Sequence, residues 1–300
     1  MLFDHPKPRP IDHREINPSV HWAQHQDVAK TPGGTRRLYD FEIMYVYSGE
    51  MRVQFNEPDE TIAYYPGDLL FLHSANQHLI EIVSDHGASL MGIHFDFYDE
   101  FEITPDLYMV VDEERALAGQ FCYLPVNPNG ECVFARRYAS IPIEITTAME
   151  RVCDEFTTAR PGFELACKGH MLVILSALAR LQPLPGRTMS HVYQEALREL
   201  AEELFHSMHL SWPIAAMALR LNVSEDHFIR LFKENYGVTP IQYIRQIRHQ
   251  EAKRCLRETD MKIERIGERV GYPELHHFSN AFKKWQGISP REYRKMCNLL

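Results

Sequence analysis

Histidine and cysteine are the side chains of this chain best suited to metal or redox chemistry, and their spacing argues against both. Eight of the 16 histidines precede residue 95, yet they form no ligand cluster. The six cysteines are scattered and include no close pair, which indicates neither a zinc knuckle nor a disulfide framework. We therefore expect no metal, no cofactor and no catalytic residues.

Lysine and arginine concentrate near the C-terminal end of a chain whose net charge is −9. Residues 210–297 contain 16 lysines and arginines against 10 aspartates and glutamates, a net charge of +6. A basic end on an acidic body favours local binding of a polyanion. This end of the chain is thus the first candidate for a binding surface.

One stretch of this basic region occurs twice, at an offset of fifty residues. The copies are "FKENYGVTPIQY", which starts at 232, and "FKKWQGISPREY", which starts at 282. Gly237 and Gly287 suit the position that ends a helix. The following "TPIQ" and "SPRE" both fit a capping box with proline at the first helical position. Each copy is therefore expected to stop one helix and start another.

Each copy also closes a predicted helix-turn-helix. In the first, "PIAAMALRL", "NVS" and "EDHFIRLFKENY" form helix, turn and helix; in the second, "IERIGERV", "GYP" and "ELHHFSNAFKKW" do so. The helix between the units, from Pro240 to about Arg257, would be roughly 27 Å long at 1.5 Å per residue. With its flanks it can hold two recognition helices about 34 Å apart, one turn of B-DNA.

The pattern before this region indicates strands followed by helices. Aromatic and β-branched residues between 36 and 97 are broken by turn signals every eight to twelve residues, as in a barrel or sandwich. The longest apolar stretch, "MLVILSALARL", is too short to cross a membrane, so we expect a soluble cytoplasmic protein. The expected organisation is a domain over 1–182 with strands at about 20–135 and helices at about 141–182, a linker at 183–190, and a helical domain over 191–300.

The C-terminal region closely resembles the AraC/XylS family of transcription regulators. The resemblance covers about residues 191–297 and lies in "RLNVSEDHFIRLFKENYGVTP", "RQIRHQEAKRCLRETDMKIERIGERVGY" and "HFSNAFKKWQGISPREYR". It implies that the partner is double-stranded DNA, read in two successive major grooves by the second helix of each unit. Such regulators also implicate RNA polymerase as a partner.

The resemblance also implies which residues meet the DNA. Base contacts would come from Asp226, Ile229, Arg230, Leu275, His276, His277 and Asn280. Arg230 suits guanine and Asn280 suits adenine, since each pairs in a bidentate manner with those base edges. Backbone contacts would come from Ser224, His227, Arg248, Lys253, Arg254, Lys283, Lys284 and Arg294.

The strand region resembles the cupin sensor domain that precedes such modules. The resemblance lies in "FEIMYVYSGEMRV", "YYPGDLLFLHSANQHLI" and "GIHFDF". Of the four ligand positions of metal-binding cupins, Glu42 and His78 fit two, while the expected His-x-His pair falls at Arg36 and Leu38. A small-molecule effector held by Arg36, Glu42, His78 and His94 is therefore preferred over a catalytic metal.

These features predict an α+β chain of two domains, a cupin-like β-barrel with a helical dimerisation segment and an all-α domain with two helix-turn-helix units. The predicted function is that of a homodimeric, sequence-specific transcription regulator that senses a sugar or sugar derivative and controls carbohydrate metabolism. Two alternatives stay open: a cupin-type enzyme with a helical assembly domain, and a DNA-binding regulator whose β domain is purely structural. For the helices at 141–182, core packing is the alternative to a dimer interface.

Overall fold

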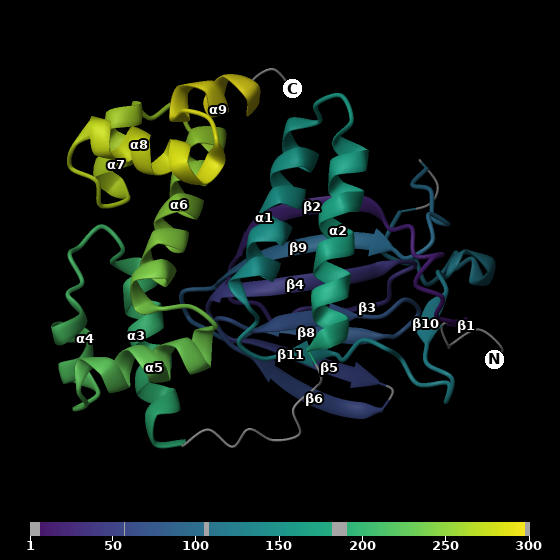
Figure 1. Cartoon of the computed structure of the whole chain (residues 1–300). Coiled ribbons are helices and arrows are strands. Elements are labelled where there is room, and N and C mark those ends of the chain that lie inside the picture. The colour runs from purple at the N-terminus through teal and green to yellow at the C-terminus, as the bar shows by residue number, and fades with distance from the viewer. Residues whose placement is uncertain (1–6, 57, 105–107, 182–190, 298–300) are drawn as a thin grey trace. The chain divides into compact units, whose positions relative to one another are not determined.

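The computed structural model describes residues 7–56, 58–104, 108–181 and 191–297 of the chain (Figure 1). Contacts divide the chain into two compact units, residues 1–187 and 188–300, and each unit is described by itself. The linker expected at 183–190 lies outside the described residues. The first unit combines strands with helices and the second is helical, so the predicted α+β class is confirmed.

The N-terminal unit contains two main antiparallel sheets and one short parallel pair of strands. The strands are β1 (Pro8–Pro10), β2 (Ser19–Val28), β3 (Thr35–Arg36), β4 (Phe41–Ser48), β5 (Met51–Asn56), β6 (Asp59–Tyr64), β7 (Leu69–Leu72), β8 (His78–Ile82), β9 (Ala88–Asp96), β10 (Leu124–Val126) and β11 (Arg137–Tyr138), with a 3₁₀ turn at Ala118–Gln120. One sheet has the order β11-β7-β4-β9-β2 and the other has β3-β8-β5-β6, while β1 pairs with β10.

The two main sheets pack face to face around one apolar core. Met44 and Leu90 of the five-stranded sheet share this core with Val53 and Ile82 of the four-stranded sheet. In β5 the side chains alternate between buried and exposed, as expected for a strand with one face on the core. The strand order of the described residues does not close on itself, so a closed barrel is not confirmed.

Two helices cover the outer face of the five-stranded sheet. α1 (Ile143–Thr158) packs against β2 and β9, and α2 (Phe163–Arg180) packs against α1 and β2 (Figure 1). All eight residues of β4, the central strand of this sheet, are buried. Glu150 of α1 accepts a hydrogen bond from the Tyr47 hydroxyl, and its other carboxylate oxygen lies 3.2 Å from Nε2 of His25. These polar contacts fix α1 on the sheet.

The C-terminal unit contains both predicted helix-turn-helix units. Its helices are α3 (His191–His206), α4 (Ile214–Arg220), α5 (Glu225–Tyr236), α6 (Pro240–Glu258), α7 (Ile263–Arg269), α8 (Leu275–Gln286) and α9 (Pro290–Cys297). The first unit is α4 and α5, and the second is α7 and α8. Among the helices described in either unit, none combines the length and hydropathy needed to cross a membrane.

The helix ends follow the predicted local chemistry. The Thr239 hydroxyl accepts from the backbone N–H of Gln242, whose side chain accepts from the backbone N–H of Thr239, so the capping box that starts α6 is complete. Ser289 and Glu292 exchange the same bonds at the start of α9. Gly237 ends α5 with φ near +70°, a conformation that glycine adopts without steric cost.

A chain of buried charged groups crosses the interior of the N-terminal unit. His21 lies between two carboxylates, with Nδ1 2.8 Å from Asp40 and Nε2 3.1 Å from Asp96. His94 also lies between two, with Nδ1 3.0 Å from Asp40 and Nε2 3.5 Å from Glu42. His21, with a carboxylate at each ring nitrogen, can donate both N–H groups only when it is protonated. Burial alone would lower the pKa of His94, but Glu42 and Asp40 outweigh burial and raise it, which favours the cationic form of His94 too.

The chain continues from Glu42 into the four-stranded sheet. Arg36 donates from Nη2 to Glu42 at 2.6 Å and from Nε to Nε2 of His78 at 3.1 Å. His78 accepts that bond because its Nδ1–H donates to the carbonyl of Asn76. Burial and the charge of Arg36 lower the pKa of His78 to about 3, so this histidine is neutral. The cations Arg36, His94 and His21 are thus matched by three carboxylates.

The pairing of His21 predicts that the N-terminal unit loses stability in alkaline solution. Burial alone would lower the pKa of His21, but its bonds to Asp40 and Asp96 outweigh burial and raise the pKa to about 9. Because the folded pKa exceeds the unfolded value of 6.5, the stabilisation is complete below pH 6.5 and is lost as the pH rises through 9. Urea unfolding at pH 6, 7.5 and 9 should reveal a decrease of roughly 3 kcal/mol in the free energy of unfolding.

The variant His21→Gln should remove most of this alkaline dependence and lower stability at pH 6. His13→Gln, which replaces an exposed histidine of the same unit, is the matched control and should retain the wild-type profile. An unchanged profile in His21→Gln would contradict the assignment of the alkaline loss to His21.

Candidate functional site

The helix that is expected to read bases in the first unit is α5, whose outer face is open to solvent. Asp226 and Arg230 are exposed, and Ile229 is partly exposed on the same face. Phe228 and Phe232 point into the core on the opposite side and anchor the helix. The spacing of three and four residues between the outer side chains places them on one helical face, as the sequence predicted.

The turn before α5 is held by local hydrogen bonds. Asn222 takes up a φ of +53°, which asparagine tolerates better than most residues. The Ser224 hydroxyl accepts from the backbone N–H of His227 and so caps α5. The ring of His227 packs edge-on against Tyr193 of α3 at 5.9 Å. Both residues that were expected at the DNA backbone therefore have structural contacts at the start of the reader helix.

The helix that is expected to read bases in the second unit, α8, has the same construction. Leu275, His276, His277 and Asn280 are all exposed. On the buried side, Phe278 lies so close to α7 that a Cβ on Gly267 would be 3.2 Å from its ring and Cβ. A small residue is thus required where α7 and α8 cross. The predicted readers of α8 lie on its solvent side, 45% of Leu275 being exposed.

The expected phosphate contacts fall into different environments. Lys283 and Lys284 are exposed near the end of α8, where a phosphate can reach them. Lys253 is only 2% exposed and lies in the interior, so it is removed from the expected contacts. Arg254 is partly buried and donates to both carboxylate oxygens of Glu251, at 2.7 and 2.8 Å. Its charge is already paired within α6.

Arg248 and Arg294 also point inward. Arg248 donates to the backbone carbonyls of Met208 and Leu210, and Arg294 donates to carbonyls at and beyond the end of α6. These arginines hold helix ends in place, which differs from the phosphate contact that the sequence suggested. Arg245, three residues before Arg248, is exposed instead and was not selected. No feature of the sequence separates the two arginines.

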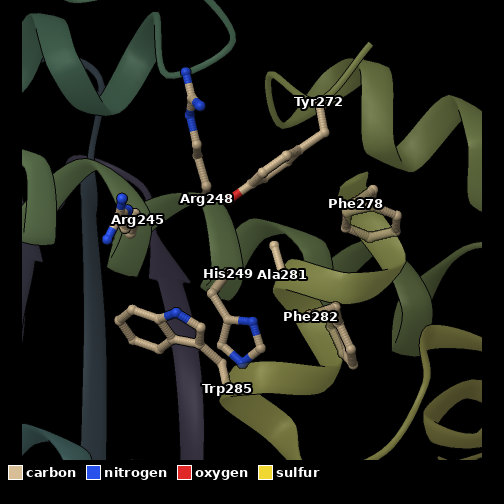
Figure 2. Close-up of a pocket in the computed structure, with 8 residues that line it drawn as sticks. All are labelled: Arg245, Arg248, His249, Tyr272, Phe278, Ala281, Phe282 and Trp285. Atoms are coloured by element: carbon tan, nitrogen blue, oxygen red, sulfur yellow. The ribbon is translucent and has the colours of Figure 1, made fainter. Parts of the chain in front are cut away.

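A shallow pocket lies between α6 and α8 on this unit (Figure 2). It is lined by Arg245, Arg248, His249, Tyr272, Phe278, Ala281, Phe282 and Trp285. The imidazole of His249 packs against the rings of Phe282 and Trp285, with centroid distances of 4.9 and 5.5 Å. Nε2 of His249 also lies 3.1 Å from the side-chain oxygen of Gln286. The contacts of this pocket attach the second reader helix to α6.

The four residues expected to bind an effector lie together in the N-terminal unit. Arg36, Glu42, His78 and His94 are successive members of the buried charged chain described above. Asp40 and Asp96 belong to the same chain but were not predicted from the sequence, although each stands two positions from a predicted residue and Asp96 shares the face of β9 with His94. Within the described residues, no group of histidines, cysteines and carboxylates is arranged to hold a metal ion.

Comparison with known proteins places the helix-turn-helix units. Residues 217–296 match the family model described as "Helix-turn-helix domain". The chain is 28% identical over 273 residues to the uncharacterized HTH-type transcriptional regulator YisR of Bacillus subtilis, with 86% of each chain covered. It is 30% identical over 109 residues to the arabinose operon regulatory protein of Escherichia coli, with 36% of each covered.

Among solved structures, the C-terminal domain of AraT, a response regulator from Geobacillus stearothermophilus, is 32% identical. The alignment covers 37% of this chain and 88% of that domain, with a TM-score of 0.32. The matched region 217–296 extends from α4 to α9 and so contains both helix-turn-helix units. The similarity to YisR extends well beyond that region. The C-terminal region is therefore a helix-turn-helix domain of the AraC type, and over most of its length the chain is similar to a transcription regulator.

Proposed function

We propose that this regulator reads DNA with α5 and α8 in two successive major grooves. We also propose that its N-terminal unit senses a neutral, hydroxyl-rich molecule and forms a homodimer. The observation that carries the DNA-binding part is the pair of solvent-facing reader faces, each fixed by buried aromatic residues to the same unit as α6. The 19 residues of α6 correspond to about 28 Å, which with the flanking turns suits one helical turn of DNA.

The reader faces differ in chemistry, which supports reading of two different half-sites. Arg230 on α5 offers a bidentate donor to guanine, and Asn280 on α8 offers a donor and an acceptor to adenine. His276 and His277 add further polar groups on α8. Lys283 and Lys284 follow on the same helix and supply charge for the phosphates. The repeated scaffold therefore presents two different base preferences.

Alanine variants should separate base reading from phosphate contact. Arg230→Ala and Asn280→Ala should each cost about 1–3 kcal/mol and relax the preference at one position of the site. Lys284→Ala should weaken binding to all sequences alike and reduce the slope of log K against log salt by about 1. The measurement is selection from a random duplex pool, followed by gel-shift titration at several salt concentrations.

The control variant is Lys30→Ala, which removes an exposed lysine from the N-terminal unit. It should leave both the selected sequence and the salt slope unchanged. A shallow salt dependence of the wild-type chain, or the same selected sequence from Arg230→Ala, would argue strongly against the proposed reading of DNA.

The proposed ligand chemistry follows from the balanced charge of the polar chain. Three cations face three carboxylates, so no net charge is available to hold an anionic ligand, whereas hydroxyl groups can exchange bonds with Arg36 and Glu42. The Arg36 side chain is 27% exposed and is the accessible member of the pair. Trp22 and Glu42 pack closely on the backbone of β9 here, since a Cβ on Gly92 would be 3.0 Å from Trp22 and 3.2 Å from Glu42. A relative named for the arabinose operon also supports a sugar.

A thermal-shift screen of the full chain tests this ligand class. L-Arabinose and other neutral pentoses and hexoses should raise the melting temperature, while uronates and benzoate should not. Gly92→Ala should reduce the shift because its methyl group would displace the side chains of Glu42 and Trp22. Gly34→Ala is the matched control, since a Cβ there meets nothing within 4 Å. Shifts with charged compounds alone would overturn the ligand class, and no shift at all would favour a purely structural β unit.

The proposed dimer surface is an apolar stripe along α2. Leu165, Leu172 and Val173 are 74%, 42% and 50% exposed, and a Cβ on Gly169 would meet nothing within 4 Å. An antiparallel pairing of two copies about Leu172 brings Glu164 in the first turn of one helix near Arg180 in the last turn of its partner. Both charges lie eight residues from Leu172, so the pairing is complementary under a twofold axis.

Leu172→Glu should convert the dimer to a monomer, because it places two carboxylates at the centre of the apolar stripe. Leu117→Glu, which changes an exposed leucine of the same unit outside α2, is the matched control and should remain dimeric. Sedimentation analysis at micromolar concentration measures both. A monomeric wild-type chain, or a dimeric Leu172→Glu variant, would contradict the proposed surface.

A further inference from the structure

Arg248 of α6 joins the turn of the second helix-turn-helix unit to the segment that leads into the first unit. Its Nε donates to the carbonyl of Met208 at 2.7 Å, and Nη2 donates to the carbonyl of Leu210 at 2.8 Å. Both carbonyls belong to the segment between α3 and α4 that leads into the first unit. Nη1 donates to the carbonyl of Gly271 at 3.4 Å, in the turn of the second unit. A single guanidinium thus connects the segment before the first unit with the turn of the second unit.

The side chain is closely fitted on the side of the second unit. Its guanidinium carbon lies 5.6 Å from the centre of the Tyr272 ring, and Figure 2 shows Arg248 and Tyr272 close together at the edge of the pocket. Gly271 has a φ of +84°, and a Cβ there would lie 2.7 Å from the guanidinium and 3.0 Å from the carbonyl of Met208. The turn of the second unit therefore has little freedom to move relative to Arg248.

The contacts with three carbonyls in two segments require arginine. Its planar fork presents five N–H donors in fixed directions, while lysine has one compact ammonium group. Arg248 is partly buried, and this burial lowers its pKa, so the three carbonyls take the place of part of the hydration of its guanidinium. A surface contact with phosphate would leave such a side chain in solvent.

Arg294 provides an internal comparison. It donates to the carbonyls of Leu256 and Met261 from α9, as Arg248 does to the segment after α3. Both carbonyls lie near the end of α6 or just beyond it. Arg294 therefore contacts only the region around the second unit, whereas Arg248 contacts both the turn of the second unit at Gly271 and the segment that leads into the first unit.

We infer that Arg248 is a positioning residue that fixes the separation and relative orientation of the two reader helices. This inference depends on the proposed function, since it assigns a role in matching two half-sites. It predicts that loss of the three-carbonyl contact leaves each half-site readable while the fixed spacing between the half-sites is lost.

The test uses the full chain and duplexes derived from the site that the wild type selects. In these duplexes the half-sites are separated by the selected distance, or by one to three base pairs more or fewer, each base pair adding about 3.4 Å and a tenth of a turn. The wild type should prefer one spacing at least about tenfold, a difference of about 1.4 kcal/mol. Arg248→Lys should bind all spacings within about threefold, with unchanged affinity for an isolated half-site.

Arg248→Lys keeps the charge, so a phosphate contact would survive it and the spacing preference would remain. Arg294→Lys is the control for loss of a carbonyl-bound arginine, and it should retain the wild-type preference. Gly271→Ala, which displaces the same guanidinium, should reproduce the effect and serves if Arg248→Lys does not fold. If the folded Arg248→Lys and Gly271→Ala variants keep the sharp spacing preference of the wild type, the inference is wrong. If the wild type itself selects no bipartite site, the proposed function is wrong instead.

Discussion

Helix α6 supplies the constraint on which the C-terminal unit depends. It contacts α3 and α5 from the first half of the unit and α7 and α9 from the second, so both halves are packed on one rigid element. Its start is fixed by the capping box of Thr239 and Gln242. Because an α-helix has a fixed rise per residue, the distance between the two helix-turn-helix units depends on the number of residues in α6. The angle between α6 and α7 is then set by side chains such as Glu251, which pairs with Arg269 of α7 at 2.8 Å.

The N-terminal unit is organised by a different interaction, the alternation of cations and carboxylates through its interior. Desolvation offsets much of the attraction within buried ion pairs, so such a chain contributes less to stability than its short distances suggest. Its more definite effect is geometric, since each group has one orientation that satisfies both neighbours. Asp96 extends this order into the chain that follows β9, where it accepts four successive backbone N–H groups, from Tyr98 to Phe101.

The sequence predicted best what depends on neighbouring residues. The caps at Ser224 and Thr239 and the left-handed turn at Asn222 involve partners only a few positions away, and the structure contains all three. Burial of Lys253 depends on residues distant in the chain, and so does the inward direction of Arg248. When a helix is covered on several sides, its local sequence does not indicate which side a charged residue faces. The order of the strands, in which no closed barrel is seen, also depends on residues distant in the chain.

The capping residues and the reader residues occupy separate positions. Gly237 and Thr239 end and begin helices without touching the outer face of α5, and the buried side of α8 is held by Phe278 and Phe282. Substitutions on the outer faces therefore leave the folding free energy of the unit largely unaffected. In evolutionary terms, each half can acquire a new base preference without the other, so a duplicated scaffold can come to read an asymmetric target that no dimer of identical single units would match.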